Sequence, residues 1–318
     1  MIGILAMAAA LVAADMSPGA VTELAPGVTL VAGAVPEDRG PDGNSVIFAA
    51  RDGLVVVDTG RHVSHSDAIL AFAARERRPI AAILNTHWHL DHSSGNRRLK
   101  AAFPEARLYA TSAIDRALTS FIARNLARAQ DRLAAGGLSA GEEAETRLFV
   151  ETMDARESLR PDVVIARAER MRIAGRRFDV RVTDHAVTDA DLWLYDRRTH
   201  IAVLGDLVTL PAPFFETACT ERWREALDEV WATPFRIAVP GHGAPMTREQ
   251  FAVYRDAYGA FVDCVHGESE ARLCAEAWRD GVAALMPETQ RGDAMAYADY
   301  YVGFLREHGG ESEECENR

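Results

Sequence analysis

Histidine and aspartate side chains are concentrated in one short segment of this 318-residue chain. Between His87 and His92, three histidines and Asp91 occur within six residues, whereas the whole sequence contains only ten histidines. The segment follows an apolar run, Ile80–Leu84, that predicts a buried strand. Alternate side chains of an extended backbone point to the same side, so His87 and His89 can reach one metal ion. Asp91 and His92 follow where the chain turns, and they can bind a second metal nearby.

Imidazole and carboxylate ligands without thiolate indicate zinc, with iron or manganese as alternatives. A metal with three or fewer protein ligands keeps a position for water, which distinguishes catalytic from structural zinc. Two metals that share a water lower its pKa from about 15.7 toward 7, so that hydroxide forms at neutral pH. The segment therefore predicts a catalytic centre in which a bridging hydroxide attacks a carbonyl or phosphoryl group.

Short apolar runs separated by turn residues predict strands on both sides of this segment. The runs are Val28–Val31, Ser45–Ala49, Leu54–Asp58, Phe178–Val182, Leu192–Tyr195, Ile201–Leu204 and Phe235–Val239. Each β-rich half is followed by helical patterns. This order favours an αββα sandwich over a parallel doubly wound sheet.

Helical periodicity replaces the strand pattern from about 112 to 160. Apolar residues recur on one helix face from Ile114 to Leu133, and a second helix passes through Met153. Thr247 and Gln250 have the spacing of a capping box, which predicts helices from about 247 to 308. We interpret 15–318 as a single domain with a helical insertion and a helical C-terminal extension.

The first fourteen residues are apolar throughout and are followed by a polar stretch. This length matches a signal-peptide core, and Val12–Ala14 offers small residues for cleavage, although no Lys or Arg precedes Arg39. We expect residues 1–14 to be a signal peptide and the mature protein to be periplasmic or secreted. A buried N-terminal helix or a misplaced start is the alternative. No other apolar run is long enough to anchor the mature chain stably in a membrane.

Four cysteines, an even number, are compatible with an oxidising compartment. They are Cys219, Cys264, Cys274 and Cys315, which allow three pairings, and Cys264–Cys274 is the most local of these. Four unpaired thiols remain an equal alternative.

The net charge of the chain indicates which class of partner it binds. The chain has 35 Lys and Arg against 47 Asp and Glu, a formal charge of −12, and no basic block. Because nucleic-acid binding needs a basic face, we expect a small-molecule substrate instead.

Five motifs, in order over about residues 25–246, resemble the metallo-β-lactamase superfamily. They are Val55–Gly60, which contains Asp58; the HxHxDH segment with Gly95 and Asn96; His185; Asp206 after a strand and a glycine; and His242 in Pro240–Gly243. The resemblance implies that His87, His89 and His185 hold one metal, that Asp91, His92 and His242 hold the other, and that Asp206 bridges them. It also implies that Asp58 supports the ligand segment and that Asp91 orients the nucleophile and carries a proton.

The third motif departs from the family pattern, His-Thr-x-Gly-Asp. Ala186 and Thr188 stand where threonine and glycine are usual. His185 is nevertheless the expected ligand, because the only other histidine between the segment and His242 is His200, in a polar turn.

An aspartate at the bridging position resembles the thioesterase, lactonase and phosphodiesterase branches more than dedicated β-lactamases. We therefore predict a di-zinc hydrolase of a small carbonyl substrate: an ester, lactone, thioester or lactam. The alternatives are a mononuclear iron enzyme similar to persulfide dioxygenases, a dedicated β-lactamase, and a metal carrier without catalysis. Trp88, Phe214 and Phe215 are expected to line an apolar pocket mouth, although plain packing is an equal alternative for each.

Overall fold

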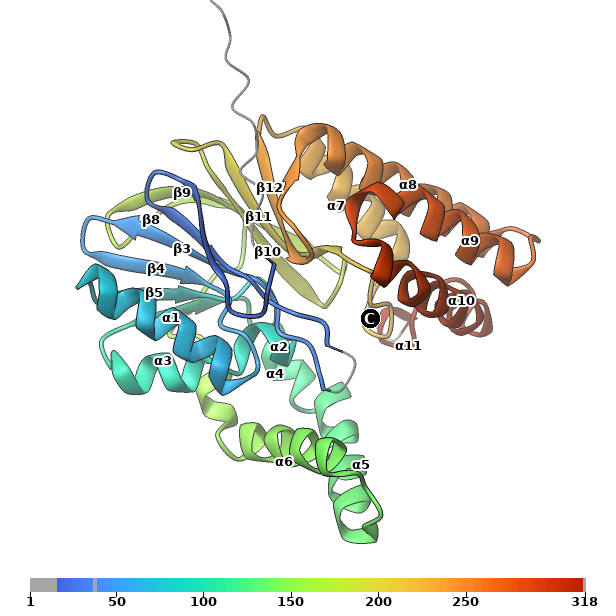
Figure 1. The fold of residues 1–318 in the computed structure, drawn as a ribbon, viewed down its shortest axis with the longest axis horizontal. Helices are drawn as coiled ribbons and strands as arrows, with labels where there is room; N and C mark the ends of the chain where they lie inside the picture. Colours follow the sequence, from blue (N-terminus) through green and yellow to red (C-terminus); the bar gives the residue numbers. More distant parts are fainter. Residues whose placement is uncertain (1–15, 37–38, 317–318) are drawn as a thin grey trace, which may run out of the picture.

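Two β-sheets face each other, with helices on both outer sides (Figure 1). The computed structural model describes residues 16–36 and 39–316, so the predicted signal peptide lies outside the described residues. The first sheet contains, in spatial order, β1 (Val21–Ala25), β2 (Val28–Val31), β3 (Ser45–Ala50), β4 (Gly53–Val57), β5 (Ile80–Leu84), β6 (Arg107–Ala110) and β7 (Val163–Val164). The second contains β13 (Met246–Thr247), β12 (Ile237–His242), β11 (Ile201–Thr209), β10 (Ala190–Asp196), β9 (Arg176–Asp184) and β8 (Glu169–Ile173). The predicted αββα sandwich is confirmed.

Apolar side chains from both sheets form one shared core between them. Phe48 of β3 and Phe178 of β9 meet there, with ring centroids 5.0 Å apart. Helix α1 (Val63–Glu76) connects the parallel strands β4 and β5 and packs on the outer face beside α3 (Asn96–Ala102). Because parallel neighbours run in one direction, their carboxyl ends meet at the same edge of the sheet. This arrangement places the residues after β4 beside the histidine segment after β5.

A second, aromatic core lies between the other sheet and the C-terminal helices. These helices are α7 (Thr220–Trp231), α8 (Arg248–His266), α9 (Ala271–Val282) and α10 (Arg291–Glu307). Trp223, Tyr258 and Trp278 are fully buried in this core. The capping box at Thr247 and Gln250 is present at the start of α8, as predicted.

The helical insertion contains α4 (Ala113–Ala117), α5 (Phe121–Ala135) and α6 (Ala140–Asp154), and the α5–α6 pair extends away from the sandwich (Figure 1). The apolar stripe predicted from Ile114 onward is divided between α4 and α5. At the break, the hydroxyls of Thr119 and Ser120 each donate to the carbonyl of Arg116 at 3.0 Å, which competes with helix continuation. The core of the insertion includes Trp88 of the histidine segment.

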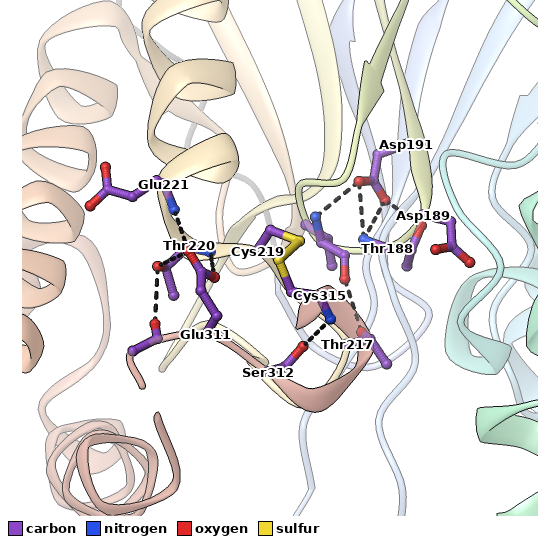
Figure 2. Close-up of a disulfide and its surroundings, with 12 residues drawn as sticks. Thr188, Asp189, Asp191, Thr217, Cys219, Thr220, Glu221, Glu311, Ser312 and Cys315 are labelled. Atoms are coloured by element: carbon purple, nitrogen blue, oxygen red, sulfur yellow. Dashed lines mark hydrogen bonds between the residues drawn. A yellow bond between two sulfur atoms is a disulfide. The ribbon is translucent and has the colours of Figure 1, made fainter. Parts of the chain in front are cut away.

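Two disulfides fasten the C-terminal half. Cys264–Cys274, the predicted local pair, joins α8 to α9. Cys219–Cys315 joins the residue before α7 to α11 (Glu313–Glu316), as Figure 2 shows. Within the described part of the chain, no helix has the length and apolar character needed to cross a membrane.

Candidate metal centre

Two pairs of parallel strands, one pair in each sheet, bring the side chains of four of the five motifs to one edge of the sandwich. The histidine segment follows β5, and α2 (Leu90–Ser93) begins within it. In the other sheet Asp206 lies in β11, and His242 ends the neighbouring parallel strand β12.

Six of the seven predicted ligand side chains come together there.

Asp91, His92 and His242 form the first set of converging side chains, which we name the Asp91 group. The Nε2 atoms of His92 and His242 lie 3.2 Å apart. Asp91 Oδ2 lies 2.9 Å from His242 Nε2 and 3.6 Å from His92 Nε2. Three donor atoms from three different side chains therefore face one point.

His87, His89 and Asp206 form the second set, the His87 group. Asp206 Oδ2 lies 3.6 Å from His87 Nε2 and 3.9 Å from His89 Nδ1. The other oxygen, Oδ1, lies 3.1 Å from His92 Nε2 in the Asp91 group. Asp206 thus stands between the two groups and presents one oxygen to each.

Both groups fit a divalent metal ion. Two ligand atoms at about 2.1 Å from one tetrahedral metal are about 3.4 Å apart, which is close to the separations within each group. His87 Nε2 is buried and has no hydrogen-bond partner among the described residues. A buried nitrogen left in this state calls for a partner such as a metal.

Hydrogen bonds behind three of the histidines leave the inward nitrogens free to bind. His92 Nδ1 donates to Asp58 Oδ2 at 2.9 Å. His87 Nδ1 donates at 2.9 Å to the hydroxyl of Thr86, which in turn donates to Asp58 Oδ2 at 2.7 Å. A proton on the outer ring nitrogen fixes the tautomer whose inner nitrogen carries a lone pair. Asp58 therefore supports both groups, as the resemblance implied.

Thr217 performs the same task for His89. His89 Nε2 donates to Thr217 Oγ1 at 3.0 Å, and the Thr217 hydroxyl donates to the carbonyl of Val187 at 2.9 Å. Thr217 lies two residues before Cys219, whose disulfide appears beside it in Figure 2. Sequence reasoning missed Thr217, because no motif marks it and 128 positions separate it from His89.

The centre concentrates negative charge in a buried place. Burial opposes a charged imidazole, yet the nearby carboxylates of Asp206, Asp91 and Asp58 raise the pKa of His92 well above its ordinary value. Burial likewise opposes ionisation of Asp206, but His92, His242 and His87 lower its pKa well below the usual range. Carboxylates that stay ionised while buried attract a cation strongly.

Two glycines permit this close packing. A Cβ on Gly241 would lie 1.9 Å from Asp206 Oδ1, and one on Gly43 would lie 2.3 Å from the His92 ring. Any larger residue at either position would displace a predicted ligand.

The structure does not gather His185 into either group of described side chains. It follows β9 at a positive φ of 59°, and its backbone N–H donates to the carbonyl of Asp189. Farther along this loop, the buried carboxylate of Asp191 accepts hydrogen bonds from the backbone of Val187 and from Thr188. Burial raises the pKa of Asp191 to about 6. The assignment of His185 as a ligand stays a prediction.

A cavity of about 870 Å³ opens above the two groups. As predicted, Trp88 and Phe214 line it, together with Asp91, Asp206 and other side chains. The expectation for Phe215 is wrong: its ring is fully buried in the aromatic C-terminal core, where it packs against Trp223. Adjacent residues on an irregular segment point in different directions, so Phe214 and Phe215 separate.

Comparisons with known proteins agree with this geometry. A sequence model of the metallo-beta-lactamase superfamily matches residues 38–242. A hydroxyacylglutathione hydrolase of Synechococcus sp. is 49% identical over 53 residues, which are 17% of this chain and 20% of that protein. An atrochrysone carboxyl ACP thioesterase of Aspergillus fumigatus is 34% identical over 86 residues, 26% of this chain and 27% of that protein. The chain thus matches only about a fifth to a quarter of the length of these relatives.

Solved structures share the fold at low identity. A metallo-beta-lactamase from Pontibacter korlensis has a TM-score of 0.53 and 18% identity, covering 73% of this chain and 94% of its own. A stereoselective inverting sec-alkylsulfatase from Pseudomonas sp. has a TM-score of 0.57 and 18% identity, covering 89% of this chain and 50% of its own. Since the superfamily model spans more than half of the sequence and includes both groups of side chains, this chain belongs to the metallo-β-lactamase superfamily.

Proposed function

We propose that this protein is an exported hydrolase that uses two zinc ions to cleave a small carbonyl substrate: an ester, thioester, lactone or lactam. The observation that carries the proposal is the position of Asp206, which presents one oxygen to each group of ligand atoms. A carboxylate placed in this way suits two metals that share it. Ligands of imidazole and carboxylate without thiolate suit zinc.

The chain's own residues supply orientation and proton transfer. Zinc ions, when bound, would activate a water and polarise the substrate carbonyl. Asp91 lines the cavity as well as belonging to the Asp91 group, so its carboxylate can orient the attacking water. The same carboxylate can then carry a proton to the leaving group. Asp58 acts behind the ligands, where its bonds to His92 and Thr86 hold the segment in place.

Two observations support a small carbonyl substrate. The curated relatives carry the names of a hydroxyacylglutathione hydrolase and a thioesterase, although they match short segments only. The formal charge of −12 disfavours a nucleic acid as the substrate. A small-molecule ester or thioester is consistent with both.

Export to the periplasm or the medium is supported by the cysteines. All four are paired, in Cys219–Cys315 and Cys264–Cys274, and such bonds persist in oxidising compartments. Fractionation of the native host, with mass spectrometry of the mature N-terminus, tests the export and the predicted cleavage near residue 14. Full-length protein in the cytoplasm would contradict it.

The test of the hydrolase proposal combines metal analysis with a substrate panel. Wild-type protein with quantified metal should contain two zinc ions and hydrolyse at least one class in a panel of esters, thioesters, lactones and lactams. His89→Ala and Asp206→Ala should each abolish hydrolysis, while His266→Ala, which alters a half-exposed histidine at the end of α8, should retain it.

Other outcomes would overturn the proposal. Retained turnover in either ligand variant would exclude the dinuclear assignment. If the protein contained one equivalent of iron and consumed oxygen, it would be an oxygenase rather than a hydrolase. If the fully metal-loaded protein hydrolysed no substrate of the panel, a metal carrier would be indicated.

A further inference from the structure

We propose that the cavity above the metal centre selects substrates with a large apolar acyl group, aromatic or of medium aliphatic chain length, in ester or thioester linkage. This inference rests on the proposed hydrolase function and specifies which part of the substrate the protein recognises. Its basis is the composition of the cavity walls, their exposed aromatic rings, and the state of their charged groups.

Two helical segments, far apart in the sequence, each contribute a wall of the cavity. The insertion contributes Phe121 and Ile122 from α5 and Phe149 from α6. The C-terminal extension contributes Tyr297, Tyr300 and other residues of α10. A cavity of about 870 Å³ lies toward the upper end of the range of about 300–1,000 Å³ for small-molecule sites. An acetyl group would leave most of this apolar space in contact with water.

Aromatic rings form a continuous path from the rim to a predicted metal ligand. Tyr300 and Tyr301 lie 5.0 Å apart between ring centroids, and Tyr301 and Phe214 lie 6.3 Å apart. Phe214 in turn lies 5.2 Å from the ring of His89. An acyl chain or aryl ring laid along this path would place its carbonyl at the metal centre.

The rings at the rim are unusually open to solvent. Tyr297 is 48% exposed and Tyr300 is 54% exposed, and both line the cavity. Large apolar side chains that gather in the open at a cavity mark a binding site for an apolar partner. Tyrosine suits such a rim, because its ring packs against apolar groups while its hydroxyl stays hydrated.

The charged groups of the described lining already have partners. Arg61 is the arginine of this lining, and its Nη1 lies 3.7 Å from Oε2 of Glu145 in α6. Burial raises the pKa of Glu216, whose carboxylate also accepts a hydrogen bond from the Tyr300 hydroxyl. Asp91 and Asp206 belong to the ligand groups. The lining therefore offers little to attract a carboxylate or phosphate on the acyl group.

Hydrogen bonds hold the insertion wall against the sandwich. Glu145 of α6 accepts a hydrogen bond from His62 Nε2 at 2.8 Å and another from the backbone of Gly40 at 3.1 Å. The other end of the His62 ring donates to Asp42 at 2.8 Å. The wall is thus in place before a ligand arrives, which reduces the entropy lost on binding.

One wall lies outside the region that the superfamily model matches. The match ends at residue 242, whereas α10 begins at Arg291. The tyrosines of α10 therefore lie on the C-terminal extension, outside the part of the sandwich that the superfamily model matches.

The experiment compares 4-nitrophenyl acetate with 4-nitrophenyl octanoate on zinc-loaded protein. Each methylene removed from water strengthens binding about fourfold. If about half of the six additional methylenes enter the cavity, kcat/KM should favour octanoate by about 50-fold. The double variant Tyr297→Ala, Tyr300→Ala should reduce this preference to about fivefold or less, mainly through KM.

Two further variants separate filling of the cavity from general damage. Ala296→Trp places a bulky ring in the cavity at an exposed position of α10, and it should weaken octanoate hydrolysis more than acetate hydrolysis. Leu273→Ala is the matched control, because Leu273 is as exposed as Tyr300 but lies on α9, outside the cavity. It should leave both activities unchanged.

Binding of the neutral fluorescent probe N-phenyl-1-naphthylamine provides a readout that does not depend on turnover. The wild type and Leu273→Ala should bind it, and Ala296→Trp should not. Equal kcat/KM for the two esters in the wild type would overturn the inference while leaving the hydrolase proposal standing. If no ester, thioester, lactone or lactam is cleaved, the hydrolase proposal fails, and probe binding alone decides whether the cavity is an apolar site.

Discussion

The Asp91 group and the His87 group share Asp206 but differ in what they contain and in what stands behind them. When Asp206 is counted in both, the Asp91 group has four side chains and the His87 group has three. A carboxylate, Asp58, backs His92 in the first group, whereas neutral hydroxyls of Thr86 and Thr217 back the histidines of the second.

This difference implies unequal metal affinity. A carboxylate that accepts the outer N–H of an imidazole makes its inner nitrogen more basic and fixes its orientation. Hydrogen bonds to a charged acceptor are roughly twice as strong as those between neutral groups. We therefore expect the Asp91 group to hold zinc more tightly and the His87 group to release it first.

Removing one histidine from each group should give the largest effect and the sharpest contrast. Loss of a hydrogen-bond partner behind a metal ligand lowers metal affinity by up to roughly 100-fold. His92→Ala removes the ligand itself, so it should lower the zinc affinity of the Asp91 group by more than this. His89→Ala should leave one tightly bound zinc ion. Metal content after gel filtration in chelator-treated buffer measures both. Equal loss of zinc from the two variants would remove the basis for ranking the groups.

Stepwise chelation of the wild type should show the same order without any mutation. A zinc-chelating dye should remove one zinc ion per chain at a low dye concentration. Removal of the second should need a dye concentration at least about tenfold higher, the effect expected of the hydrogen-bond partners behind the histidines. A titration with a single step for both equivalents would show that the groups are matched.

Asp58→Asn tests the carboxylate itself. Asp58 has a positive φ of 58°, a conformation that asparagine tolerates, so the backbone should survive the change. The tight zinc ion should bind about 10–100-fold more weakly, because the outer partner of His92 loses its charge. Asp52→Asn, at an exposed aspartate paired with Arg51, is the control and should not alter zinc affinity. Competition titration against a dye of known affinity gives the numbers.

The resemblance implied the full membership of the Asp91 group, because its members lie in two compact motifs at strand ends. Asp91 and His92 follow β5, and His242 ends β12. Strand periodicity and motif spacing are local signals, and the αββα order of elements followed from them. The same signals placed His87 and His89 on one side of an extended segment after a strand, and the resemblance added Asp206.

Features that depend on contacts between distant segments were not predictable in the same way. The support of His89 by Thr217 joins residues 128 positions apart without a motif. The tyrosine wall comes from α10, where a helical pattern alone cannot tell which face meets a cavity. Phe214 and Phe215 are equivalent by composition, and only the path of the chain after β11 divides them between cavity and core.

Thr217→Val should give the smallest effect and tests the weaker group alone. Valine keeps the shape of threonine but cannot accept the hydrogen bond that His89 Nε2–H donates, so the ring loses its fixed orientation. Zinc affinity of the His87 group should fall by about tenfold, the lower end for an outer partner, and the tight zinc ion should be unaffected. Thr152→Val is the control, since that hydroxyl donates to the carbonyl of Leu148 within α6. If Thr217→Val instead weakened zinc binding by the Asp91 group, the two groups would be coupled through Asp206, and their affinities would not be set by separate hydrogen-bond partners.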